Sequence, residues 1–187
     1  MKKLFLIVML FVAAQAHALE IGDVHVDEKI QLDNHQLVLN GAGIRKKFIV
    51  KAFVGALYLG EKTHSADTVL ADTGPKRMSY SMLREVTGKQ VLDRISESIL
   101  ANNSLEEMTV LETRFYIFEK IFLSVPVIRK GDIIDLDYIP ESGTHVLVNS
   151  FDKGHIEGAD FYRSLLKTWI GNKPVQASLK KNLLGEE

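Results

Sequence analysis

The sequence predicts an α+β fold, because strand-like and helix-like segments are grouped along the chain instead of alternating. After the first 18 residues, the chain is rich in β-branched and aromatic residues, which favour strands. The middle carries two helix-start signatures, each followed by apolar residues at helical spacing. Strand patterns then return, and further helical segments follow them to the end of the chain.

The first strands are expected between residues 35 and 83. Residues 35–40, HQLVLN, are predicted to run as a strand into a turn at residues 41–43, Gly-Ala-Gly. Residues 46–60 are rich in β-branched and aromatic side chains and are expected to form one long strand. Another alternating strand is expected from Arg77 to Leu83, after the turn at Gly74-Pro75.

Two helices are expected in the middle of the chain. Thr87 with Gln90, and Ser104 with Glu107, have the spacing of capping boxes, in which each side chain bonds the backbone of the other residue. An apolar and largely aromatic stripe follows the second box at intervals of three or four residues, and we expect it to lie in the core. The stripe consists of Met108, Leu111, Phe115, Phe118 and Phe122.

A hairpin and two helices are expected after Pro126. Residues 132–138 alternate between apolar and polar, and residues 145–149 follow the turn at Gly143-Thr144, which predicts two paired strands. Residues 159–170 have a helical pattern that stops at a glycine. A last amphipathic piece covers residues 178–184.

The N-terminus has the three parts of a cleavable signal peptide in the right order. Two lysines precede an apolar run over residues 4–14, and Ala16-His17-Ala18 forms an A-x-A cleavage site. The run is shorter than the about 20 apolar residues of a membrane span. We therefore expect residues 1–18 to be removed and residues 19–187 to form a single domain without a stable membrane anchor. The signal is typical of general bacterial export, which favours the periplasm over secretion into the medium.

The composition excludes several classes of function. Export would remove two of the 23 basic residues and none of the 24 acidic ones, changing the formal net charge from −1 to about −3. The densest basic spot, Arg45 to Lys47, is too small for a surface that follows nucleic acid phosphates. The chain has no cysteine, so disulfides and thiolate chemistry are excluded. The histidines are scattered singly, and we expect neither a metal nor a cofactor.

One cluster of residues remains that could carry chemistry. No G-x-S-x-G, phosphate-binding glycine loop or H-E-x-x-H motif occurs. In Gly41-Ala42-Gly43-Ile44-Arg45, small residues lead to one arginine ahead of an apolar strand. At the mouth of an apolar sheet, that guanidinium could hold a carboxylate or polarise a carbonyl, while the sheet and helices enclose a hydrophobic body. The competing interpretation of Arg45 is a solvated surface residue.

Two segments resemble the chalcone isomerase family. They are LNGAGIRKKFIVKAFVGALYL, residues 39–59, and FYRSLLKTWIGNKPVQASLKKNLLG, residues 161–185. The similarity runs from about residue 35 to 184 and is greatest to the exported bacterial chalcone isomerase-like branch. It implies an open-faced β-sandwich, in which a layer of helices covers a large antiparallel sheet and an apolar cleft lies between them.

The resemblance also implies site residues. The family's arginine stabilises a developing enolate in catalytic members and holds the carboxylate in fatty-acid-binding relatives, and it falls on Arg45. The strand threonine falls on Phe53 and the cleft tyrosine on Val91, neither of which can donate a hydrogen bond. The cleft asparagine falls on Ser98, and the C-terminal helix threonine on Thr168. The implied ligand-binding residues are Arg45, Phe53, Val91, Ser98, Thr168 and Trp169.

Three functions are compatible with these residues. The first is binding of an amphipathic carboxylate or carbonyl ligand, which needs only Arg45 and an apolar cleft. The second is an isomerase of the intramolecular lyase type acting on an unsaturated or enolisable carbonyl compound, with Arg45 as electrophile and Thr168 and Ser98 as hydrogen-bond partners. Each lost donor costs roughly 10²- to 10³-fold in rate, which argues against efficient chalcone cyclisation. The third is an interaction module with a filled core, where Arg45 pairs with an acid. We expect the first.

Overall fold

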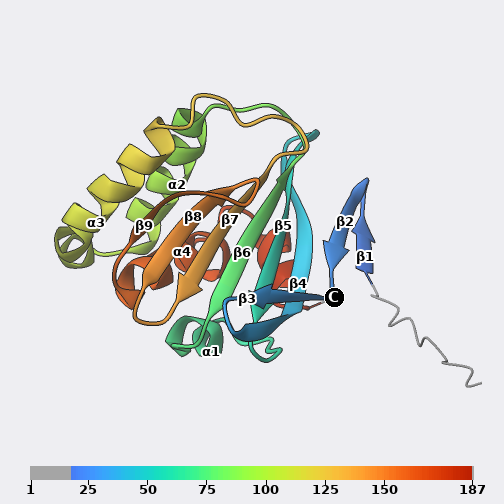
Figure 1. Ribbon diagram of the computed structural model, residues 1–187, viewed down its shortest axis with the longest axis horizontal. Helices are drawn as coiled ribbons and strands as arrows, with labels where there is room; N and C mark the ends of the chain where they lie inside the picture. The colour runs from blue at the N-terminus through green and yellow to red at the C-terminus, as the bar shows by residue number, and fades with distance from the viewer. Residues whose placement is uncertain (1–17, 187) are drawn as a thin grey trace, which may run out of the picture.

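A seven-stranded antiparallel sheet forms the centre of the protein (Figure 1). The computed structural model describes residues 18–186. Each strand of the sheet lies beside its neighbours in the chain, so the sheet is a meander with helices inserted in the connections. The strands are β3 (Lys29–Leu32), β4 (His35–Lys47), β5 (Val50–Leu59), β6 (Lys76–Met82), β7 (Ile133–Ile139), β8 (Gly143–Val148) and β9 (Phe151–Ile156).

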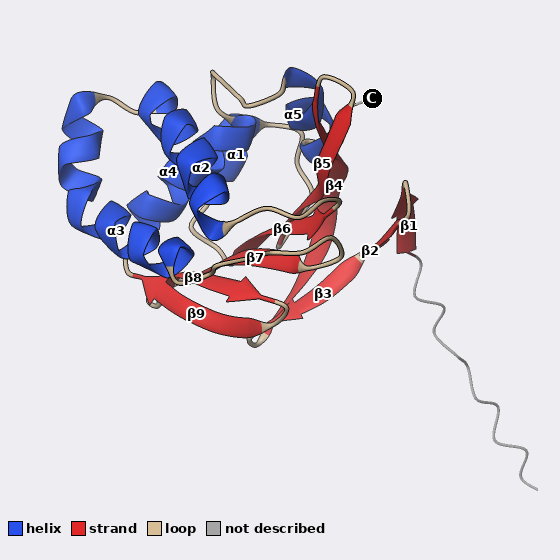
Figure 2. Ribbon diagram, turned by 90° about the horizontal axis from the view of Figure 1, so that it is seen from above, coloured by secondary structure: helices blue, strands red, loops and turns tan. Residues whose placement is uncertain are grey.

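The helices lie on one face of this sheet (Figure 2). The predicted α+β class, with a layer of helices over a large antiparallel sheet, is therefore confirmed. None of the helices within residues 18–186 is long and apolar enough to cross a bilayer. The helices are α1 (Ala66–Ala71), α2 (Gly88–Asn102), α3 (Leu105–Leu123), α4 (Ala159–Ile170) and α5 (Ala177–Leu183).

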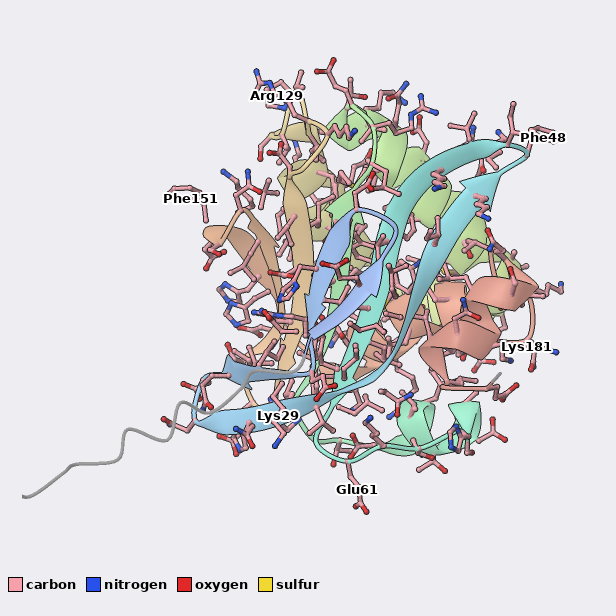
Figure 3. The ribbon with its side chains drawn as sticks, turned by 90° about the vertical axis from the view of Figure 1, so that its right-hand side faces the viewer. Lys29, Phe48, Glu61, Arg129, Phe151 and Lys181 are labelled. Carbon is pink, nitrogen blue, oxygen red and sulfur yellow. The ribbon has the colours of Figure 1, made fainter. Side chains whose placement is uncertain are left out.

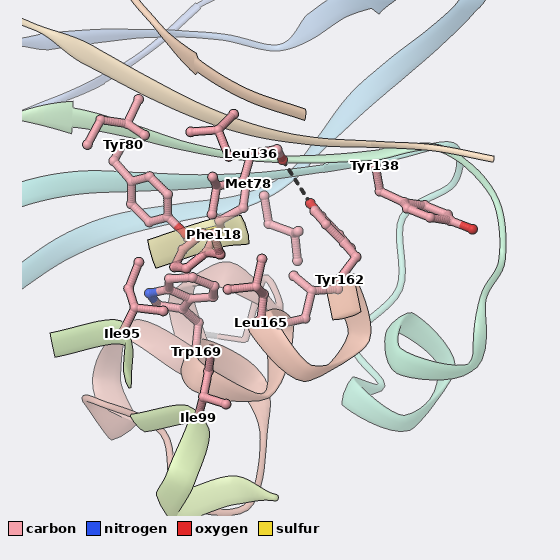
Figure 4. Close-up of a cluster of buried hydrophobic side chains, with 14 of the residues drawn as sticks. Met78, Tyr80, Ile95, Ile99, Phe118, Leu136, Tyr138, Tyr162, Leu165 and Trp169 are labelled. Atoms are coloured by element: carbon pink, nitrogen blue, oxygen red, sulfur yellow. Dashed lines mark hydrogen bonds between the residues drawn. The ribbon is translucent and has the colours of Figure 1, made fainter. Parts of the chain in front are cut away.

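The main core fills the space between the sheet and the helices. Met78 and Leu136 point from neighbouring strands toward Leu165 of α4 and Phe118 of α3, and all four are almost completely buried (Figure 4). The predicted aromatic stripe of α3 contributes to this core. Its Phe118 contacts Phe122, with ring centroids 4.7 Å apart.

The two predicted capping boxes are both present. The Thr87 side chain accepts from the backbone N–H of Gln90, and the Gln90 side chain accepts from the backbone N–H of Thr87. Ser104 and Glu107 make the same reciprocal pair at the start of α3. Each box satisfies two of the N–H groups that a helix start leaves without partners. The sequence therefore predicted both helix starts correctly.

The opposite face of the sheet carries a smaller apolar cluster. The hairpin of β1 (Ala18–Ile21) and β2 (Val24–Asp27) lies beside this face, and Val26 of β2 packs in the cluster. On the same face, Arg77 holds Asp137 through two hydrogen bonds of 2.5 and 2.6 Å. Such a two-pronged contact lets two charged side chains be buried together.

Two strand predictions were wrong in detail. Residues 41–43, predicted as a turn, lie inside β4. Residues 46–60 are not one strand, because a tight turn at Phe48 and Ile49 separates β4 from β5. The glycines of β4 serve packing instead of a turn. A Cβ atom on Gly41 would overlap the carbonyl oxygen of Asn182 in α5, and one on Gly43 would lie 2.7 Å from the Asn182 Cβ.

Several short elements were not predicted. Residues 151–156 form the edge strand β9, a segment for which no strand was predicted. This strand contains Gly154 at φ 137°, and its pairing with β8 shifts register between Val146 and Leu147. These irregularities obscure the alternating pattern on which strand prediction depends. Strands β1 to β3 have only four residues each.

We predict that Gly41→Ala lowers the free energy of unfolding by about 1–3 kcal/mol or more, because the added methyl group would push α5 off β4. Chemical denaturation measures the change. Gly60→Ala is the matched control, since a Cβ at Gly60 meets no atom within 4 Å. Equal stability of the two variants would contradict the tight contact between α5 and β4.

Candidate functional site

A cavity of about 550 Å³ lies between the sheet and helices α2 and α4. This volume is within the usual range for small-molecule sites, about 300–1,000 Å³. Strands β4 to β7 contribute one wall, and the segment after α4 contributes part of the rim. The apolar side chains that line the cavity are Val50, Ala52, Phe53, Met82, Val86, Val91, Ile95, Ala101, Phe122, Ile134, Trp169 and Val175.

The sheet register explains how Arg45 reaches this cavity. Arg45 of β4 lies opposite Phe53 of β5, which in turn lies opposite Met82 of β6. Directly opposed residues project from the same face of a sheet. The three side chains therefore form one row across the helix-facing side. Gly55 and Tyr80 belong to the next row, and the side chains of Met78 and Phe53 pack against Gly55.

Arg45 is held in place by neutral groups. Its Nη1 donates to Oε1 of Gln176 at 3.1 Å and to the carbonyl oxygen of Lys46. Gln176 also accepts from the backbone N–H of Lys46 at 2.8 Å and donates to the carbonyl oxygen of Ile44 at 3.2 Å. Within residues 18–186, Arg45 makes no salt bridge. Its position is fixed while its charge has no acidic partner there.

The mouth of the cavity is positively charged. Burial, and then the positive charge of Arg94, lower the pKa of Arg45 from its usual value. The one acidic side chain in the lining, Glu97, is paired with Arg94 at 3.0 Å. The whole chain has a formal net charge of −1, so this concentration of positive charge is local. The basic residues of the lining are Arg45, Lys47, Arg84, Arg94 and Lys173.

Two buried hydroxyl groups belong to the cavity lining. The hydroxyl oxygens of Tyr80 and Thr168 have no hydrogen-bond partner among residues 18–186. The Tyr80 ring contacts Phe53 and Trp169, with centroid distances of 5.1 and 5.3 Å, and Figure 4 shows it beside Trp169. Burial raises the pKa of Tyr80 well above its usual value, so the group remains a donor. A buried hydroxyl without a partner is costly, and a polar ligand atom would relieve that cost.

All the residues implied by the resemblance line this one cavity. Phe53 comes from β5, and Val91 and Ser98 lie two turns apart on α2. Thr168 and Trp169 come from the C-terminal half of α4. The fold thus brings together residues that are more than 120 positions apart in the sequence, from Arg45 to Trp169. Their roles toward a ligand stay predictions.

The sequence interpretation missed several residues of the site, among them Arg94 and Tyr80. Arg94 lies three positions after Val91 and four before Ser98, so helical spacing alone places it on their side of α2. Tyr80 alternates with Met78 and Met82 along β6. That alternation predicts a shared face, but the register that brings Tyr80 beside Phe53 arises from the tertiary pairing of β5 with β6.

Elsewhere in residues 18–186, support for a functional site is weaker. A smaller cavity of about 270 Å³ lies between α3 and α4, and its Lys167 is already paired with Glu107 at 2.8 Å. No group of three or more His, Asp or Glu side chains that could hold a metal ion occurs in the described part of the chain.

Comparison with known proteins relates this fold to a family. A fatty-acid binding protein of Arabidopsis thaliana has a solved structure similar to this one, with a TM-score of 0.72 over 90% of this chain and 96% of that chain. The two sequences are 14% identical, so the likeness is one of fold. No curated protein matches the sequence. The model of the family described as chalcone isomerase-like matches residues 18–185. The chain therefore belongs to the chalcone isomerase-like family, and the open-faced sandwich implied by the resemblance is its fold.

Proposed function

We propose that this protein binds an amphipathic carboxylate such as a fatty acid, with the carboxylate at Arg45 and the hydrocarbon chain in the cavity. The observation that carries the proposal is the partly buried guanidinium of Arg45 at an apolar cavity, without a salt bridge to any described acid. Burial and the charge of Arg94 lower the pKa of this cation from its usual value. An anionic head would offset both effects.

The apolar lining supports the second half of the proposal. A hydrocarbon chain placed against Phe53, Val91 and Trp169 would be removed from water, and each buried methylene contributes about 0.8 kcal/mol. The similar fold of the Arabidopsis protein, which is named as a fatty-acid binding protein, supports the same ligand class. The alternative of a filled core around Arg45 does not fit a cavity of about 550 Å³ at that residue.

We also propose that the protein belongs to the exported bacterial branch of the family and works in the periplasm. The support is the signal-peptide pattern of residues 1–18, which lies outside the described residues except for Ala18. The family match begins at residue 18, where that pattern ends. Residues 19–187 would then be the mature, single-domain protein.

A second candidate function is isomerisation of an enolisable carbonyl compound. The unpartnered hydroxyls of Tyr80 and Thr168 favour it, because they could donate to an oxygen that gains negative charge during the reaction. Tyr80 offers a hydroxyl that the resemblance did not place in the cleft. Binding remains the preferred proposal, because it requires no group that transfers a proton, whereas isomerisation does.

For the binding proposal, we predict that Arg45→Ala weakens the binding of a long-chain fatty acid roughly ten- to a hundred-fold, because a hydrogen bond to a charged group contributes about 1.5–3 kcal/mol. Isothermal titration calorimetry measures the change. The methyl ester of the same acid should bind the wild type more weakly than the acid, and Arg45→Ala should bind both alike. Arg129→Ala, which removes an exposed arginine outside the cavity lining, is the control.

In the same titrations, the affinity of the wild type for the fatty acid should fall as the pH is lowered. The wild type should bind the acid best above the pKa of the free carboxyl group and lose affinity as the pH falls and the carboxylate becomes protonated. Affinity for the ester should not follow this change. If the acid and its ester bind equally well to the wild type at neutral pH, Arg45 does not hold a carboxylate.

For export, we predict that the protein expressed with its own N-terminus in a bacterium begins at Leu19 and is released with the periplasmic fraction. Intact mass spectrometry locates the cleavage site. Changing Ala16 and Ala18 to bulky residues should leave the full-length precursor, because signal peptidase requires small residues there. Full-length wild-type protein in the cytoplasm would disprove this part of the proposal.

For the second candidate, we predict little or no cyclisation of a chalcone by the wild type, since the implied threonine and tyrosine positions are occupied by Phe53 and Val91. The rate is followed by loss of the chalcone absorbance. Turnover above the uncatalysed rate that both Arg45→Ala and Tyr80→Phe abolish would instead make isomerisation the main function.

A further inference from the structure

The turn between β4 and β5 exposes two large apolar side chains to solvent. Phe48 is 91% exposed and Ile49 is 95% exposed. Figure 3 shows Phe48 at the end of this hairpin, projecting from the body of the protein. Phe48 also has a positive φ of 55°, a conformation that glycine or asparagine adopts more easily. Neither the exposure nor the conformation is explained by packing within the protein.

The turn is surrounded by positive charge. Residues 45–51 read Arg-Lys-Lys-Phe-Ile-Val-Lys and contain four basic residues and no acidic one. Lys46, Lys47 and Lys51 are exposed. An apolar tip within a basic collar is complementary to an anionic lipid surface, because the tip can enter the acyl region while the lysines meet the headgroups.

The hairpin is continuous with the mouth of the cavity. Arg45, Lys47 and Val50 belong both to the hairpin and to the cavity lining. Phe48 and Ile49 do not line the cavity. A bilayer that receives the tip would therefore lie next to the opening where Arg45 is held. An amphipathic acid could then move between bilayer and cavity with little exposure of its chain to water.

From these observations we infer that the β4–β5 hairpin docks reversibly on an anionic phospholipid bilayer, with Phe48 and Ile49 inserted and the lysines on the headgroups. The docking itself follows from the hairpin. Its use in loading or unloading a fatty acid rests on the proposed function. The contact is a surface one, in keeping with the absence of a membrane-spanning helix among residues 18–186.

Co-sedimentation of the mature protein with vesicles tests the docking. We expect binding to vesicles of phosphatidylcholine with phosphatidylglycerol, and much weaker binding to phosphatidylcholine alone or at high salt. Phe48→Ser combined with Ile49→Ser should weaken partition at least about tenfold, by loss of the inserted apolar surface. Lys46→Gln combined with Lys51→Gln should weaken it roughly tenfold, and only on the anionic vesicles.

A matched control is Leu105→Ser, because Leu105 is also an exposed apolar residue, at 87%, and belongs to α3 and not to the β4–β5 hairpin. It should partition as the wild type does. Failure of the wild type to bind anionic vesicles, or equal binding by the Phe48/Ile49 variant, overturns the inference. A second outcome would also overturn it: the wild type does not bind vesicles, and sedimentation velocity shows that it forms a dimer which the Phe48/Ile49 variant does not form. The tip would then join two copies of the chain.

Titration of a dissolved fatty acid separates this inference from the proposed function. The Phe48/Ile49 variant should bind the dissolved acid with wild-type affinity but take it up from anionic vesicles more slowly. Wild-type protein that binds the dissolved acid but no vesicles would refute the docking and leave the proposed function standing. Wild-type protein that binds vesicles through the tip but binds no acid would support the docking and refute the proposed function.

Discussion

The close packing of α5 on β4 determines where the rest of the site can lie. Gly41 and Gly43 lack side chains at the points where Asn182 of α5 comes nearest, so the helix can rest directly on the strand. At the other end of the contact, Gln176 bonds the backbone on both sides of Arg45 as well as its guanidinium. Where this tight layer ends, the sheet is no longer covered closely, and the cavity begins at the Arg45 row.

The cavity combines features that are unfavourable unless a ligand provides partners for them. A partly buried guanidinium faces another arginine in place of an acid, and the hydroxyls of Tyr80 and Thr168 are buried without protein partners. Each of these is costly by itself. The same groups become favourable once an anionic or polar ligand atom enters, which is how a binding site is prepared at the expense of stability. The exposed Phe48 beside the cavity mouth leaves apolar surface in water, which the proposed bilayer contact would bury.

Local sequence patterns predicted helices α2 to α5 and most central strands, because capping boxes and alternation depend on residues close together in the sequence. The short helix α1 was not predicted. The same reasoning interpreted Gly41-Ala42-Gly43 as a turn. The sequence alone cannot distinguish a glycine that is needed in a turn from a glycine that lets a helix pack closely on a strand. The implied site residues do gather at one cavity, whereas Tyr80 was missed because its place depends on strand register. The charge at the mouth was predicted only in part: the basic spot from Arg45 to Lys47 is visible in the sequence, but Arg84, Arg94 and Lys173 join it only in the fold.

The central claim is that Arg45 receives the acidic head of a ligand whose chain fills the cavity. A crystal structure of the mature protein grown with a long-chain fatty acid tests it most directly. The account predicts a carboxylate within hydrogen-bond distance of the Arg45 guanidinium and a hydrocarbon chain running toward Tyr80 and Trp169. Density for the acid elsewhere on the protein, or a chain in the cavity whose carboxylate points away from Arg45, would contradict it.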